Sequence, residues 1–224
     1  MLRNCFKTIF RATSVCFQKI VVKQFLKKKP AIARIFLLLV AGSFYSCNPD
    51  TPEKPGPPPA YFDVQEYLKN QINYLNQTKP TVQKTVTNGI LPPETETVKQ
   101  VNWQQELAFF LEADINKNAW RSTYSGDTLV NEATGARTMN YRNAGEANAP
   151  VKLLQVETTA GNRVKNIYLE TRQHNALFFA GRFLKISCDT TSNQNRIAAY
   201  QVSGVQKPVF ADSLHYSVRA KILY

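Results

Sequence analysis

The side chains that most resemble a catalytic set lie near the C-terminus, where Asp212, Ser213 and His215 are almost consecutive. An acid, a hydroxyl and an imidazole are the parts of a serine nucleophile with its general base. The segment reads as a strand, however, and neighbouring strand residues point to opposite faces. No GxSxG motif or oxyanion glycine lies nearby. We therefore predict that this cluster is not catalytic and that the protein is not an enzyme.

The same segment has a regular alternation that could serve binding instead. Leu214, Tyr216, Val218, Ala220, Ile222 and Tyr224 are predicted to face the core, and the polar residues between them to face water. The polar row is His215, Ser217, Arg219 and Lys221. Such a row is usually a solvated face, but it could meet anionic headgroups or saccharide phosphates. His215, Arg219 and Lys221 are accordingly the candidate ligand or headgroup face.

Cys188 is predicted to be a structural residue. It alternates with Leu184 and Ile186, so a small buried hydrophobe is expected rather than a nucleophile. His174 falls in a turn that is too distant along the strand to pair with this thiol. No CxxC pair, zinc-type spacing, P-loop or GxGxxG motif occurs. No metal or cofactor is predicted.

Cys47 has a different setting, at the end of an apolar run. Three lysines at 27–29 precede the stretch 31–45, whose fifteen residues are interrupted by Arg34. A membrane-spanning helix needs about 20 residues, so the order of charge and hydrophobicity indicates a secretory signal peptide. Residues 48–60 then include six prolines, which favour an extended tether over a packed core. A buried thiol after a core helix fits that tether poorly.

The sequence Phe44-Tyr45-Ser46-Cys47 resembles the lipobox of bacterial lipoprotein precursors of the signal peptidase II type. The resemblance implies acylation of Cys47, with chains such as palmitate, and removal of residues 1–46. It also implies the outer membrane, because Asn48 is not the aspartate that commonly retains lipoproteins at the inner membrane. Residues 1–26 exceed what a signal needs, and either a start codon placed too far upstream or an extended n-region explains them.

The net charge of +12 is concentrated in this leader. Residues 1–46 carry nine basic side chains and no acidic one, which leaves 19 basic and 16 acidic side chains in the remainder. A surplus of three charges makes no phosphate-binding footprint. Nucleic acid is therefore excluded as the expected partner.

Residues 61–224 are predicted to form a single α+β domain, after a tether at 47–60. A first helix, 63–76, opens with the capping residue Asp63 and is stopped by Pro80. A second helix opens at Asn102 and extends to about residue 115. The predicted strands are 81–87, 95–101, 120–124, 128–131, 137–141, 151–159, 163–171, 176–188, 196–205 and 214–224.

Short polar connections between the later strands favour antiparallel neighbours. The fold expected is two N-terminal helices packed on a strongly twisted antiparallel meander of about eight strands, or a half-barrel. The segment 177–186 is apolar on both faces, which predicts a central strand covered on both sides. A curled sheet with its many aromatic residues could also enclose an apolar cavity, an analogy with lipid-carrying half-barrels of the periplasm.

These features predict a lipid-anchored envelope lipoprotein that faces the periplasm or the cell exterior. The expected function is a non-enzymatic binding or envelope-assembly module for an apolar ligand or a protein partner. A structural or interaction subunit of an outer-membrane complex is the alternative. A hydrolase of envelope polymers is the weakest reading, because no acid/base or nucleophile set assembles.

Overall fold

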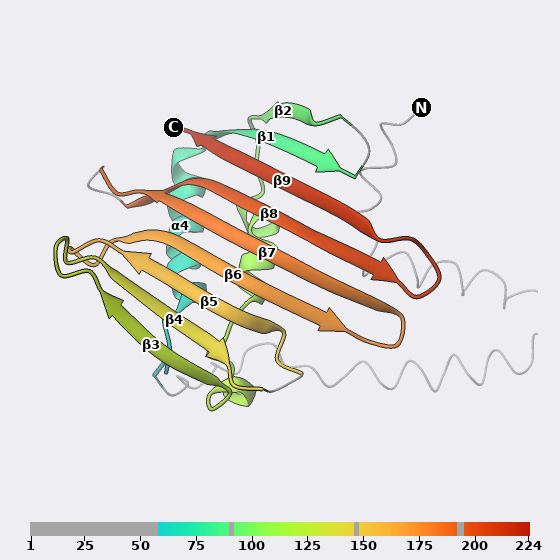
Figure 1. Cartoon of the computed structure of the whole chain (residues 1–224). Coiled ribbons are helices and arrows are strands. Elements are labelled where there is room, and N and C mark those ends of the chain that lie inside the picture. The colour runs from blue at the N-terminus through green and yellow to red at the C-terminus, as the bar shows by residue number, and fades with distance from the viewer. Residues whose placement is uncertain (1–57, 90–91, 146–147, 192–194) are drawn as a thin grey trace, which may run out of the picture. The chain divides into compact units, whose positions relative to one another are not determined.

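Nine antiparallel strands form one sheet in the computed structural model, which describes residues 58–89, 92–145, 148–191 and 195–224 (Figure 1). The strand order is β2-β1-β9-β8-β7-β6-β5-β4-β3, so β3 to β9 are a meander and β1 pairs with the last strand. The sheet has two edge strands, β2 and β3, and is not closed into a barrel. The broad prediction of an antiparallel sheet with a few helices is confirmed, with nine strands in place of about eight.

The strands are β1 (Thr81–Asn88), β2 (Glu94–Val98), β3 (Tyr124–Val130), β4 (Arg137–Asn143), β5 (Val151–Thr158), β6 (Val164–His174), β7 (Phe178–Asp189), β8 (Arg196–Pro208) and β9 (Leu214–Leu223). The helical segments are α4 (Val64–Thr78), α5 (Trp103–Glu106), α6 (Ala108–Glu112) and the 3-10 turn η1 (Asn118–Trp120). Residues 57–224 form one compact unit.

Helix α4 begins and ends where its capping residues predict. The Asp63 carboxylate accepts a hydrogen bond from the Glu66 backbone N–H at 2.8 Å. The rings of Phe62, before this cap, and Tyr67, in the first turns of the helix, have their centroids 6.1 Å apart. Lys79 adopts the left-handed conformation and donates its N–H to the Leu75 carbonyl. The predicted 63–76 helix is therefore confirmed and runs two residues further.

The second predicted helix is divided in two. Asn102 caps α5 as expected, with its side-chain oxygen 3.1 Å from the Gln105 nitrogen. Leu107 then leaves helical geometry, with φ −98° and ψ 14°, and α6 follows directly. Its apolar side chains still bury against the sheet, since Trp103, Leu107 and Phe110 are at most 2% exposed.

The sequence prediction is wrong between residues 120 and 127, whereas the predicted strand 128–131 largely coincides with the end of β3. The expected strand 120–124 is largely η1 and a turn, and the residues Ser125-Gly126-Asp127, left between two predicted strands as a turn, lie inside β3. Gly126 is opposite Tyr141 in the β3–β4 register. A Cβ at residue 126 would lie 3.1 Å from the Tyr141 ring, so this glycine makes room for an aromatic side chain rather than for a turn.

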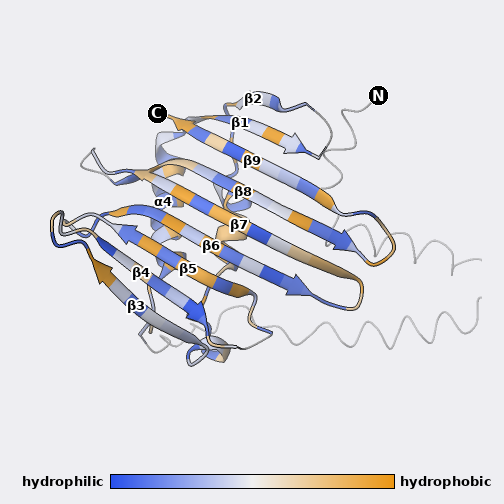
Figure 2. Cartoon of the chain, in the orientation of Figure 1, coloured by the Kyte–Doolittle hydropathy of each residue, from blue (hydrophilic) through white to orange (hydrophobic). Residues whose placement is uncertain are grey.

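All three α-helices lie on one side of the sheet, and the main core fills the space between these two layers (Figure 1). Hydrophobic and hydrophilic residues alternate along the central strands (Figure 2), as one buried and one wet face require. In β9, Ala220 and Ile222 are buried while Arg219 and Lys221 are exposed, as predicted. Leu214 and Tyr224, at the two ends of that pattern, are exposed instead.

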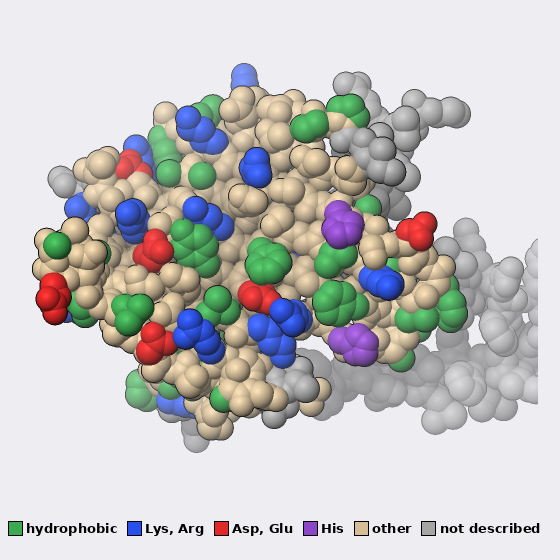
Figure 3. Space-filling model, viewed as in Figure 1, with side chains coloured by type: hydrophobic (Ala, Val, Ile, Leu, Met, Phe, Trp, Pro, Cys, Tyr) green, Lys and Arg blue, Asp and Glu red, His purple; other side chains and the backbone are tan. Residues whose placement is uncertain are grey.

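The prediction that the segment 177–186 is covered on both faces is wrong. Ala180 and Leu184 face the helices and are 2% exposed, whereas Phe179 and Phe183 point the other way and are 36% and 61% exposed. No helix of the described residues covers that second side, which we call the helix-free face (Figure 3). The exposed phenylalanines therefore need an explanation other than core packing.

Candidate functional site

Two rows of residues cross the helix-free face in strict register. The first row is Glu170, Phe183, Ser203, Ser217 and Thr87, on β6, β7, β8, β9 and β1. The second row is Arg172, Gly181, Val205 and His215, on β6 to β9. Successive residues of one row are about 5 Å apart. A ligand lying across the strands would therefore meet carboxylate, aromatic, hydroxyl, guanidinium and imidazole groups in turn.

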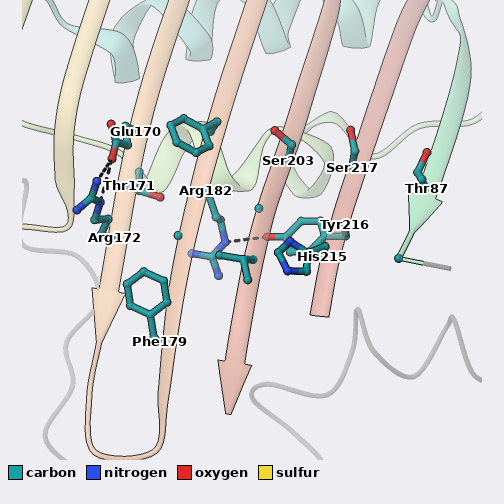
Figure 4. Close-up of a pocket in the computed structure, with 15 residues that line it drawn as sticks. Thr87, Glu170, Thr171, Arg172, Phe179, Arg182, Ser203, His215, Tyr216 and Ser217 are labelled. Carbon is teal, nitrogen blue, oxygen red and sulfur yellow. Dashed lines mark hydrogen bonds and ion pairs between the residues drawn. The ribbon is translucent and has the colours of Figure 1, made fainter. Parts of the chain in front are cut away.

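Gly181 creates a hollow between these rows. It has no side chain, and two phenylalanines on the same face of β7 stand before and after it, Phe179 (Figure 4) and Phe183. The hollow has a volume of about 550 Å³ and is open to solvent. A second hollow of about 200 Å³ adjoins it and shares Glu170, Phe183 and Ser203. Phe183 thus stands at the border of the two hollows.

The charged groups of the site remain accessible. Arg172 and Glu170 form an ion pair on β6, with Nη2 and Oε1 2.7 Å apart, and the Arg172 side chain is 60% exposed. An exposed pair of this kind contributes about 0–1 kcal/mol to folding. The guanidinium therefore keeps most of its capacity to bind a partner. In the adjoining hollow Lys185 lies 5.0 Å from the centre of the Tyr168 ring.

The floor of the hollow is fixed from the helix side. Arg182 and Tyr216 point toward the helices, and Arg182 Nε donates to the Tyr216 hydroxyl at 3.2 Å (Figure 4). The Arg182 guanidinium also lies 4.8 Å from the centre of the Phe109 ring on α6. Gly204, between these two residues in register, leaves space for the bond to cross β8. These contacts hold β7, β8 and β9 in one arrangement beneath the site.

Of the candidate residues on β9, some line the larger hollow and others lie outside it. His215 lines the larger hollow, as does Ser217. Arg219 and Lys221 lie on the same face but outside both hollows; Arg219 is in register with Gln201 of β8, and Lys221 with Ala199. The polar residues of β9 therefore share one side of the sheet, but only His215 and Ser217 belong to the hollow.

The sequence analysis missed Gly181, Phe183 and Arg172. A glycine within a strand often marks a bulge or a close approach to the backbone, and Gly181 interrupts an otherwise bulky apolar segment. Assigning both faces of that segment to the core hid the signal. The apolar cavity considered from the aromatic content is not among the two hollows described here, because both are open.

Cys188 and His174 are not brought together. His174 pairs with Phe179 at one end of β7, and Cys188 pairs with Ile197 at the other. The Cys188 sulfur lies 3.0 Å from the Tyr67 hydroxyl. Burial raises the pKa of this thiol to about 11, and the Tyr67 hydrogen bond lowers it in part. The partly buried sulfur packs against the core, as the sequence predicts.

We expect Cys188 to react slowly with thiol reagents. A thiol with a pKa near 11 is almost entirely protonated at pH 8, and only the thiolate is nucleophilic. Labelling of residues 58–224 by a chromogenic disulfide should be at least tenfold slower in the folded than in the denatured state. The rate should still rise between pH 9 and 10, where an ordinary thiol levels off. Equal rates in the two states would contradict the assigned environment.

Cys47 and residues 1–46 lie outside the described residues. In the described ranges no helix has the length and hydrophobicity needed to cross a membrane. No group of three or more His, Cys, Asp or Glu side chains within those ranges could hold a metal ion. The chain matches no protein-family model, no curated protein and no solved structure.

Proposed function

We propose that this protein is a lipid-anchored envelope protein whose helix-free face binds a partner without catalysis. The anchor is an acylated Cys47, left as the first residue after removal of residues 1–46. Its support is the apolar run that ends in Ser46-Cys47 and the six prolines that follow. The proposed location is the outer membrane, with the domain in the periplasm or at the cell surface.

The observation that carries the binding role is the exposure of Phe183. Its side chain is 61% exposed at the centre of a polar sheet face, beside the Gly181 hollow and the Arg172 guanidinium. Aromatic side chains and arginine are enriched in protein interfaces relative to other surfaces. A large apolar side chain left in water amid hydrogen-bonding groups is typical of an interface anchor.

The shape of the face favours a protein over an apolar small molecule. Small-molecule sites bury about 70–90% of their ligand, and both hollows here are too open for that. Six adjacent strands, β5 to β9 and β1, are each at least eight residues long, and eight residues of each cover roughly 29 by 26 Å. That area is close to the approximately 800 Å² that each partner contributes to a standard interface. The partner we propose is therefore another envelope protein.

Photo-crosslinking in cells would test the binding face. A photoreactive phenylalanine at residue 183 of the full chain should give a discrete adduct with one envelope protein. The same residue at Lys69, exposed on α4 in the other layer, should not. Gly181→Val should reduce the adduct at least fivefold by filling the hollow, whereas Thr97→Val at the sheet edge should leave it unchanged. An intact protein without an adduct at residue 183, or with equal adducts at both positions, would overturn the assignment.

The anchor has its own test. Cys47→Ser should move most of the protein from the membrane to the soluble fraction, because the serine hydroxyl cannot form the thioether. Mass spectrometry of the native protein should find diacylglyceryl-modified Cys47 at its N-terminus. An unmodified thiol within an intact N-terminal segment would contradict the proposal without affecting the binding face.

A further inference from the structure

Two neighbouring hairpin turns expose three large apolar side chains. The β6–β7 turn carries Leu177, 70% exposed, and the β8–β9 turn carries Val209 and Phe210, 56% and 95% exposed. The Val209 backbone N–H donates to the Leu177 carbonyl at 3.0 Å, which joins the two turns. We call this set the hairpin tips. Isolated exposed apolar residues are ordinary, but a contiguous group marks a site of interaction.

Local hydrogen bonds hold Leu177 in its outward position. The Asn175 side-chain oxygen accepts from the backbone nitrogens of Leu177 and Phe178, at 2.8 and 3.0 Å. The Asn175 N–H donates to the Phe178 carbonyl and closes the turn. The exposure of Leu177 is therefore a property of an ordered turn and not of a frayed end.

The hairpin tips lie at the end of the sheet where the described chain begins. Arg121 donates to the Pro58 carbonyl, and the Tyr61 hydroxyl donates to the carbonyl of Tyr124, the first residue of β3. Antiparallel pairing places the start of β3 beside the end of β4. The same end of the sheet then holds the starts of β5, β7 and β9 and the ends of β6 and β8. Both turns lie at this sheet end (Figure 1), and the hydrogen bonds of Pro58 and Tyr61 hold the start of the described chain beside the first residue of β3 at the same end.

The two hairpins also project beyond the neighbouring strands, since β9 begins at Leu214 but its last pair with β1 is Tyr216 with Asn88. The last pair between β5 and β6 is Val151 with Thr171, and β6 continues to His174 before its turn. Three further residues add about 10 Å at 3.3 Å per residue. The tips are therefore turn apices that project from this end, unlike the broad face around Phe183.

We propose that the hairpin tips insert into the interfacial region of a phospholipid bilayer. Projecting apices with Phe, Leu and Val fit a fluid surface better than a rigid protein partner, which would need a matching concavity. Exposed Lys207 and His174 flank the tips and can remain at headgroup level. The other charged or titratable groups near the tips are Asp212, Arg172, Glu170 and His215. The tips would add a second membrane contact to the anchor.

The position of the proposed anchor agrees with this orientation. Cys47 precedes Pro58 by eleven residues, and eleven residues span at most about 40 Å even when fully extended. A lipid at Cys47 would therefore hold Pro58 within about 40 Å of the bilayer, so that the sheet end with the hairpin tips can reach it. The orientation argument depends on the proposed anchor, while the exposed tips do not.

The test replaces the natural anchor, so that its result is independent of lipidation. Residues 48–224 with an N-terminal histidine tag are held on phosphatidylcholine vesicles by a nickel-chelating lipid. An environment-sensitive fluorophore is attached to Phe210→Cys, or to Leu129→Cys as the control. Leu129 is also 62% exposed but lies near the opposite end of β3. Cys188, with its raised pKa, should remain largely unlabelled.

The label at residue 210 should shift to shorter wavelength on the vesicles. Lipids brominated on their acyl chains should quench it at least twice as strongly as the label at residue 129. Leu177→Ser with Val209→Ser should halve that quenching without lowering the thermal transition of the domain. Absent quenching at residue 210, or equal quenching at both positions, would overturn membrane insertion and leave the proposed binding face untouched.

Discussion

Replacing Phe110 with alanine is expected to lower the free energy of unfolding by about 3–5 kcal/mol. Phe110 is 0% exposed and is the largest fully buried side chain of the described core. It comes from α6, whose five residues are too few to form a stable helix without tertiary contacts. Loss of the ring would leave a cavity and also loosen the segment that carries it.

The neighbours of Phe110 increase the expected cost. Its ring meets that of Tyr200 edge to face, with centroids 6.4 Å apart. The Tyr200 hydroxyl donates a short hydrogen bond to Glu106, and burial raises the pKa of this tyrosine. Glu106 is also paired with Lys84 at 2.6 Å, with both side chains less than 20% exposed. Water admitted by the missing ring would weaken a charged network that depends on exclusion from solvent.

Phe109→Ala is the matched control for Phe110→Ala. Phe109 is the preceding residue on the same helix, but it is only partly buried, and its ring lies against the partly buried guanidinium of Arg182. Its removal should cost about 1 kcal/mol, as a surface cation–π contact and a modest area of burial would. Urea denaturation of residues 58–224 gives both values. Similar losses for the two variants would show that α6 does not anchor the helical layer.

The sequence predicted correctly the elements that depend on contacts between residues close together in the chain. Asp63 and Asn102 cap helices as expected, because a capping hydrogen bond joins residues three positions apart. Gly126 misled the prediction, because its role depends on Tyr141 across the sheet. Contacts between distant residues leave no pattern in a short window of sequence.

The same distinction between local and distant contacts explains why only part of the candidate site could be predicted from the sequence. The alternation in β9 placed His215 on the wet face, where the structure has it, because period two is a local property. Phe183 was assigned to the core, because an apolar residue on a strand gives no sign of whether anything covers it. The two registers that place Phe183 between Glu170 and Ser203 are set by pairing with β6 and β8. That arrangement became visible only in the assembled sheet.

Two glycines on adjacent strands are expected to respond in opposite ways to the same substitution. Gly204→Ala should lower the free energy of unfolding by about 3 kcal/mol, at the upper end for overpacking. A Cβ at residue 204 would lie 2.6 Å from the Gly181 carbonyl oxygen and 3.1 Å from the Tyr216 hydroxyl. The backbone cannot move away cheaply, because β7 and β8 are paired along their length. The Arg182–Tyr216 hydrogen bond would be displaced as well.

Gly181→Ala is the control, and it should raise the free energy of unfolding by about 0.5–1 kcal/mol, because glycine is unfavourable within a strand. Its new Cβ would meet only the Phe179 ring at 3.5 Å and Val205 at 3.8 Å, which are ordinary contacts. Urea denaturation of residues 58–224 should therefore separate the two variants by more than 3 kcal/mol. Equal free energies of unfolding for the two variants would mean that the close approach of β7, β8 and β9 does not require a glycine at residue 204. In that case the floor of the hollow would not be the rigid support on which the proposed binding face depends.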